Sequence, residues 1–175
     1  MKSKVLALIL LCGAASLGAK VKLPALVGDN MILQQQTEVK LWGTAAPEAE
    51  VRVTPSWNGQ TMTCRADKDG GWTLAVETPA AGYTPYEITF DDGEKTTLKN
   101  ILIGEVWLAS GQSNMEMPLK GFAGCCIMNG ADDIIVSAEN KGVRMFTVPK
   151  HQTYELQTDC KGSWNISSIE TAPDF

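Results

Sequence analysis

The chain has 175 residues, of which 44% are hydrophobic, 20% charged and 7% aromatic, a composition typical of a globular protein. Lys and Arg number 15 against 20 Asp and Glu, which gives a formal net charge of -5. An acidic chain without a cluster of Lys and Arg offers no basic surface to a phosphate backbone, so we expect no nucleic-acid partner. The one long apolar run lies at the N-terminus and is too short to span a bilayer comfortably, which argues against a membrane span.

The N-terminus has the layout of a secretory signal peptide. Two lysines precede the apolar run Val5–Leu11, and small residues follow it up to Gly18. We therefore predict a signal peptide over residues 1–18, cleavage before Ala19, and a secreted or periplasmic protein. Cys12 follows two leucines instead of the small residue that a lipoprotein signal requires, so lipid anchoring is disfavoured.

Four cysteines remain after the predicted leader: Cys64, Cys125, Cys126 and Cys160. In an oxidising compartment they allow three complete pairings, among which the sequence cannot choose. Because a bond between neighbouring cysteines is strained, a disulfide from Cys125 or Cys126 to Cys160 is favoured. A metal site is not indicated, since the chain has a single histidine, His151, and no pair of CxxC motifs. We expect no metal and no other cofactor.

Residues 19–100 alternate apolar and polar side chains, as half-buried antiparallel strands do. Turn signals separate these stretches, and Asp92-Gly93 between Tyr86–Phe90 and Lys95–Leu98 predicts a hairpin. About seven such strands with regularly spaced turns predict an antiparallel β-sandwich. The side chains expected to face its core include Trp72, Leu74, Val76, Ile88 and Phe90.

The pattern changes after residue 100. Ile101–Ala109 is an apolar run typical of a strand buried on both faces, Ala131–Glu139 has helical spacing with acids in its first turn, and Val143–Val148 is typical of a strand. Strand, helix and strand predict a βαβ unit with parallel strands. Two parallel strands cannot cover themselves, so residues 101–175 are interpreted as the truncated start of a larger domain. The predicted fold class is therefore β plus α/β.

The segment after the first of these strands carries the candidate chemistry. Ligands of parallel α/β sheets gather at the carboxyl ends of the strands, and Ser113 lies just past such an end, in a glycine-containing turn. A serine there can project its hydroxyl into a cleft, and the backbone N–H groups after it can meet a developing oxyanion. Taken alone, Gly-Gln-Ser-Asn is equally consistent with an ordinary turn.

At these residues the sequence resembles a known family. Gly104–Leu119, which reads GEVWLASGQSNMEMPL, is similar to the nucleophile block of the sialate O-acetylesterases, which are SGNH-type serine esterases. Leu23–Leu26, Asp29–Gln35, Val39–Gly43 and Asp69–Trp72 resemble the start of that family's β-domain, in the same order. The resemblance implies that residues 101–175 begin an SGNH-type parallel-sheet α/β hydrolase domain. It also implies a metal-independent serine esterase that removes acetyl groups from sugars, typically O-acetylated sialic acid.

The resemblance also implies roles for single residues. Ser113 matches the nucleophile, and its own backbone N–H is one oxyanion donor. Gln112 and Asn114 belong to the matching motif and are expected to shape the site. Glu116 matches too, although a solvated or turn-stabilising acid explains it at least as well. Ser110 is the second candidate for the nucleophile.

The blocks that supply the family's catalytic histidine and its aspartate partner are absent from this sequence. His151 lies in a polar segment that matches neither block, so we do not assign it as the general base. The sequence therefore predicts a carbohydrate O-acetylesterase that is inactive as these 175 residues. The alternative is a secreted, non-catalytic β-sandwich module that binds a glycan or a protein, which accounts for residues 20–100 but leaves Ser113 without a role.

Overall fold

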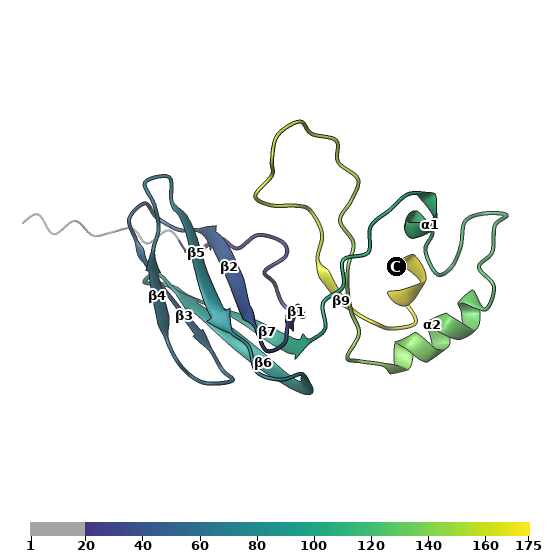
Figure 1. Cartoon of the computed structure of the whole chain (residues 1–175), viewed down its shortest axis with the longest axis horizontal. Helices are drawn as coiled ribbons and strands as arrows, with labels where there is room; N and C mark the ends of the chain where they lie inside the picture. Colours follow the sequence, from purple (N-terminus) through teal and green to yellow (C-terminus); the bar gives the residue numbers. More distant parts are fainter. Residues whose placement is uncertain (1–19) are drawn as a thin grey trace, which may run out of the picture.

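The computed structural model describes residues 20–175, so the predicted signal peptide lies outside the described residues. Figure 1 shows a sheet-rich part formed by the first seven strands, beside a part that contains the helices. None of the helices in residues 20–175 has the length and apolar character needed to cross a membrane. In chain order the elements are β1 (Ile32–Gln34), β2 (Glu38–Thr44), β3 (Glu50–Pro55), β4 (Met62–Arg65), β5 (Gly71–Glu77), β6 (Gly82–Asp91), β7 (Lys95–Gly104), α1 (Ser113–Glu116), α2 (Gly130–Glu139), β8 (Arg144–Phe146), β9 (Trp164–Ile166) and the 3-10 helix η1 (Ala172–Asp174).

The sheet-rich part consists of two sheets that share one core. Five strands form a mixed sheet in the order β1-β7-β6-β3-β4, and β2 pairs with β5 in a separate antiparallel ribbon. Within the larger sheet β1 runs parallel to β7, and the other neighbours are antiparallel. Leu41 and Val76 of the ribbon belong to the same buried cluster as Val53 and Phe90 of the mixed sheet. The part formed by the first seven strands is therefore mostly sheet, and both of its sheets contribute side chains to the main core.

The predicted alternation is confirmed in the strands. All five of the expected core residues are buried, with exposed fractions between 0% and 8%: Trp72, Leu74, Val76, Ile88 and Phe90. Their polar neighbours in β5 point away from the core, as the period of two requires. The hairpin at Asp92-Gly93 is confirmed as well, because β6 and β7 pair antiparallel on either side of it. Gly93 there has a φ of 115°, a conformation that a residue without Cβ adopts at little cost.

Phe90 is the side chain on which we expect this core to depend most clearly. Its ring is fully buried, and the centroid of the Trp72 ring lies 5.8 Å away. We predict that Phe90→Ala lowers the free energy of unfolding by about 3–5 kcal/mol, because it leaves a cavity in this core. Urea unfolding followed by circular dichroism measures the loss. Phe122→Ala, at a ring that is 47% exposed, is the matched control and should cost about 1 kcal/mol or less. Equal losses in the two variants would contradict this description of the core.

The stability of the β6–β7 hairpin is also expected to depend on pH. The backbone N–H of Gly93 donates to Asp91 Oδ1 at 2.9 Å, and Arg52 Nη2 lies 3.4 Å from Asp91 Oδ2. The Gly93 hydrogen bond, with smaller contributions from Arg52 and Lys95, holds the pKa of Asp91 below its ordinary value. A folded-state pKa below the unfolded one means that the ionised carboxylate stabilises the hairpin above about pH 4 and loses this effect on further acidification.

We therefore predict that Asp91→Asn unfolds at a lower urea concentration than the parent chain at pH 7. At pH 3 the two proteins should lie closer together, because the parent has by then lost the contribution of its carboxylate. Urea titrations at both pH values measure this. A difference between the two proteins that does not shrink on acidification would show that ionisation of Asp91 does not stabilise the fold.

The predicted parallel βαβ unit is wrong within the described residues. The helix is present as α2, but β8 pairs antiparallel with β9 and makes no pair with β7. Ile101, Leu102 and Ile103 are buried because β7 lies between β1 and β6, inside the mixed sheet. A strand buried on both faces gives a continuous apolar run whichever strand it pairs with, so the run was a correct sign of burial and a misleading sign of topology.

The apolar run divides at Gly104, where β7 ends. Val106, Trp107 and Leu108 are 45%, 87% and 93% exposed, and they leave the sheet as an irregular segment. β7 also continues across residue 100, at which the sequence places the boundary between the β-domain and the following domain. That boundary stays a prediction.

Candidate active site

The segment that leads to Ser113 is fixed where it leaves the sheet. Glu105 follows β7 directly, and its two carboxylate oxygens accept hydrogen bonds from Gln34 Nε2 at 3.0 Å and from Gln35 Nε2 at 2.6 Å. Gln34 Oε1 in turn accepts from the backbone N–H of Val106 at 2.9 Å, and Gln35 Oε1 from that of Ala81 at 2.8 Å. The hydrogen bonds from Gln34 and then Gln35 hold the pKa of the Glu105 carboxyl below its ordinary value.

Sequence reasoning included these glutamines and Glu105 in family motifs but gave them no role. The sequence did contain a signal for such a role, since two amide side chains lie at the end of one strand and an acid directly follows another strand. What the sequence does not show is that β1 and β7 are parallel neighbours, with Gln34 opposite Gly104. That register places the amides beside the acid.

Ser113 opens the short helix α1 and faces solvent. Gln112 stands at the N-cap position in an extended conformation, and its carbonyl accepts a hydrogen bond from the N–H of Met115 at 2.9 Å. The side chains of Ser113 and Asn114 are also exposed, and the Ser113 hydroxyl makes no hydrogen bond within residues 20–175. The predicted nucleophile is therefore accessible, and its hydroxyl serves no structural contact in the described chain.

Two neighbouring residues were alternatives or additions to this site. Ser110, the second candidate nucleophile, lies in the exposed irregular segment before α1. Glu116 at the end of α1 forms an ion pair with Lys150, which lies just beyond β8. This pair ties α1 to a segment more than thirty residues further along the chain. It favours a structural role for Glu116, which is closer to the turn-stabilising alternative than to a role in the site.

The structure brings no general base to Ser113 within the described residues. His151 is exposed and makes no hydrogen bond to Ser113 or to a carboxylate there. No acid–histidine pair of the kind that orients a catalytic imidazole is formed in residues 20–175. The arrangement as described can present a serine hydroxyl but has no group placed to take its proton.

The cysteines of the described chain are free, which corrects the disulfide favoured from the sequence. Cys125 and Cys126 are exposed, Cys64 and Cys160 are half-buried, and no two of them are bonded. Cys125 lies in a tight turn closed by mutual backbone hydrogen bonds with Phe122, so local hydrogen bonding accounts for this turn without a cross-link. Within residues 20–175 no group of His, Cys, Asp and Glu side chains is arranged to hold a metal ion.

The long connection between β8 and β9 projects from the molecule as a loop (Figure 1), and its later residues contact the sheet-rich part. Trp42 Nε1 donates to the carbonyl of Thr158 at 3.1 Å, and Asp159 Oδ1 accepts from the backbone N–H of Ala25 at 2.8 Å. After the connection, Trp164 Nε1 donates to the carbonyl of Leu26 at 2.9 Å, and its ring packs against the main core. These contacts attach the second part of the chain to the first.

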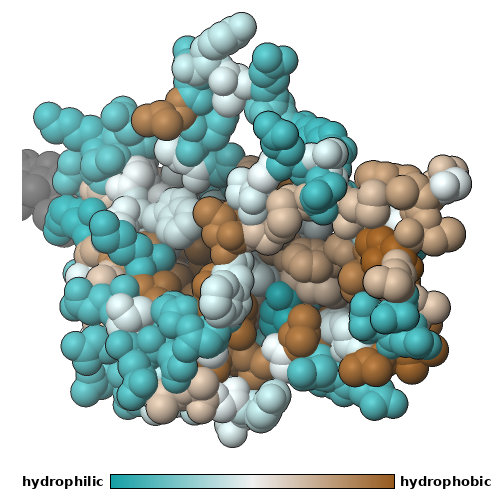
Figure 2. All heavy atoms as spheres, turned by 45° about the vertical axis from the view of Figure 1, so that its right-hand side comes forward, coloured by the Kyte–Doolittle hydropathy of each residue, from teal (hydrophilic) through white to brown (hydrophobic). Residues whose placement is uncertain are grey.

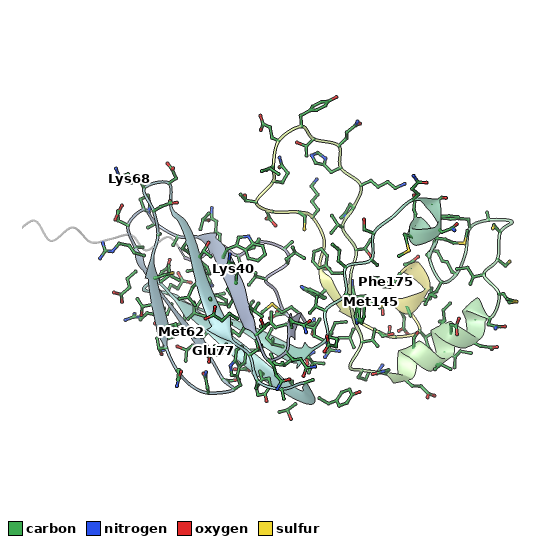
Figure 3. The ribbon with its side chains drawn as sticks, in the orientation of Figure 1. Lys40, Met62, Lys68, Glu77, Met145 and Phe175 are labelled. Carbon is green, nitrogen blue, oxygen red and sulfur yellow. The ribbon has the colours of Figure 1, made fainter. Side chains whose placement is uncertain are left out.

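The part after β7 exposes far more apolar side chain than the part before it. Of the 16 exposed large hydrophobic residues in the described chain, 14 lie in residues 106–175, and the others are Leu26 and Tyr83. Figure 2, with the helical part turned toward the viewer, shows hydrophobic side chains reaching the surface on that side. A hollow of about 210 Å³ lies there, lined among others by Met145 and Phe175, both of which are labelled in Figure 3. Ser113 does not line it.

Comparisons with known proteins give this geometry a context. No family model matches the chain. The rat sialate O-acetylesterase (Rattus norvegicus) is 27% identical over 91% of the chain and 31% of its own length. The human one (Homo sapiens) is 29% identical over 85% of the chain and 29% of its own length. The crystal structure of a carbohydrate acetylesterase from Xanthomonas citri superposes with a TM-score of 0.78 and 31% identity, over 89% of the chain and 34% of that protein.

These similarities point first to the carbohydrate acetylesterases as a class, because both the relatives by sequence and the structural neighbour are named as such enzymes. The chain is, more particularly, related to the sialate O-acetylesterases, as the motifs from Leu23 to Leu119 predicted. It spans about a third of the length of the curated relatives it matches.

Proposed function

We propose that the chain is the nucleophile-bearing part of a carbohydrate O-acetylesterase, with O-acetylated sialic acid as the preferred substrate class. The observation that carries the proposal is the placement of Ser113. It lies in the segment that resembles the family's nucleophile block, exposed at the start of α1, in a chain whose relatives are acetylesterases.

In the proposed reaction the Ser113 oxygen attacks the carbonyl carbon of the acetyl ester. The Ser113 proton passes to a general base, the bond between that carbon and the sugar oxygen breaks, and the sugar leaves with a proton as an alcohol. Water then hydrolyses the acetyl-enzyme, which releases acetate and restores the hydroxyl. The backbone N–H of Ser113 is the oxyanion donor that this chain supplies, while Gln112 and Asn114 shape the turn. The reaction as proposed uses no cofactor.

The proposed domain organisation follows the family resemblance. Residues 19–100 form a β-sandwich domain, and residues 101–175 are part of an SGNH-type esterase domain that needs further chain to be complete. The crowding of exposed apolar side chains into residues 106–175 supports the second half of this proposal, because soluble proteins seldom leave extended apolar surface uncovered. Secretion through the leader at residues 1–18 remains part of the proposal.

A chimera tests the function. In this chimera, this chain replaces the matching third of the Xanthomonas citri carbohydrate acetylesterase, and that enzyme supplies the remaining two thirds. We expect acetate release from O-acetylated sialic acid and, more slowly, from acetylated neutral sugars. A folded chimera that releases acetate from neither substrate would contradict the esterase proposal and favour the non-catalytic binding module.

A further inference from the structure

We propose that Gln34, Gln35 and Glu105 act as positioning residues, which set the direction in which the Ser113 segment leaves the sheet. We call these three residues the exit clamp. Both glutamine side chains donate to the Glu105 carboxylate. Each glutamine also accepts from one backbone N–H, that of Val106 for Gln34 and that of Ala81 for Gln35. The positioning role rests on the proposed function, but the hydrogen bonds of the clamp can be tested without an activity assay.

Hydrogen-bond complementarity requires an acid at position 105. The backbone N–H of Val106 donates to Gln34 Oε1, which leaves the NH2 group of Gln34 to donate to Glu105. The N–H of Ala81 donates to Gln35 Oε1 in the same way. Two amide donors therefore converge on residue 105, and an ionised carboxylate accepts at both oxygens, whereas a glutamine there would present a donor to a donor.

The clamp is also the last attachment before the helix. Within the described chain the Val106 N–H bond is the only hydrogen bond made by residues 106–111, and Trp107 and Leu108 are almost fully exposed. The next fixed point is the carbonyl of Gln112 inside the turn of α1. A segment of this length can extend roughly 25 Å, so a small change of direction at Val106 becomes a large displacement of Ser113.

The donor and acceptor pattern permits a stringent experiment. Glu105→Gln leaves the shape of the side chain but turns one acceptor into a donor. The double variant Gln34→Glu with Glu105→Gln restores the pattern, because residue 34 then accepts from Val106 and from residue 105, and residue 105 still accepts from Gln35. Glu87→Gln, at an exposed carboxylate of β6 without a side-chain hydrogen bond in the described structure, is the matched control.

We expect Glu105→Gln to raise the exchange rate of the Val106 amide about tenfold in the 175-residue chain, as measured by NMR. The amide signals of the Trp107–Ser113 segment should shift, those of Trp72–Val76 should not, and the double variant should return both readouts toward the parent. The control should change neither. Unchanged exchange at Val106 in Glu105→Gln, or no recovery in the double variant, would overturn the clamp.

The same variants in the chimera test whether the clamp positions the nucleophile. We expect a fall in kcat with an unchanged KM in Glu105→Gln, and recovery in the double variant. Loss of Val106 protection with an unchanged kcat would overturn the positioning role. An inactive parent chimera would contradict the proposed function instead, and the exchange measurements would still decide whether the clamp exists.

Discussion

Ser113→Ala is expected to reduce acetate release by the chimera by several orders of magnitude while leaving its fold unchanged. The substitution removes one oxygen, and with it the atom that would form the acetyl-enzyme. Residual activity would come from the oxyanion donors and from binding alone. Stability should not suffer, because the hydroxyl is exposed and unbonded in the described chain and alanine favours a helical position.

Initial rates of acetate release, measured together with the thermal unfolding midpoint, separate loss of chemistry from loss of fold. Ser110→Ala is the matched control, since it removes a hydroxyl from the same exposed segment three residues earlier. We expect that variant to keep most of its activity. The reverse result, a near-normal rate in Ser113→Ala and a loss in Ser110→Ala, would move the nucleophile to Ser110.

Strands such as β3 and β5 were predictable because one face of the strand is buried and the other is exposed to solvent. In β5 the buried Trp72, Leu74 and Val76 alternate with exposed residues, and a period of two has no other common explanation. The hairpin at Asp92-Gly93 was predictable for a local reason too, since its glycine has a positive φ. In both cases the residues that decide the structure are close together in the sequence.

Pairing between distant strands was not predictable in the same way. β1 is three residues long, and nothing in Ile32–Gln34 says that it pairs in parallel with β7, seventy residues later. Without that pairing the apolar residues Ile101–Ile103 were assigned to the wrong neighbour, and the exit clamp could not be seen. The burial of a strand can be predicted from its own residues, whereas its pairing partner depends on the rest of the chain.

The candidate site shows the same division. The exposure of Ser113 follows from its place in a polar, glycine-containing turn, which the sequence shows directly. Its role could be predicted only by resemblance to a family, since a turn of this composition is as common in structure as in catalysis. The ion pair between Glu116 and Lys150 depends on a contact between segments far apart in the chain, and no local pattern announces it.

The 175-residue chain by itself is expected to hydrolyse acetyl esters little or not at all. A serine hydroxyl is a weak nucleophile until an adjacent base takes its proton, and no such base contacts Ser113 in the described residues. His151 comes directly after Lys150, whose side chain is paired with Glu116, but the imidazole itself makes no hydrogen bond to Ser113 there. Each missing oxyanion donor costs roughly a hundredfold or more in rate, and the missing base costs more again.

The test is to incubate the purified chain, in parallel with its Ser113→Ala variant, with an activated acetyl ester and with O-acetylated sialic acid. We expect rates equal to buffer for both proteins. We also expect the chain to self-associate as its concentration rises, because Trp107, Leu108 and the other exposed apolar residues after β7 have no cover. A rate well above buffer that disappears in Ser113→Ala would show that the chain already holds a working base. Because His151 is the one histidine in the sequence, His151→Ala would then be the variant that identifies it.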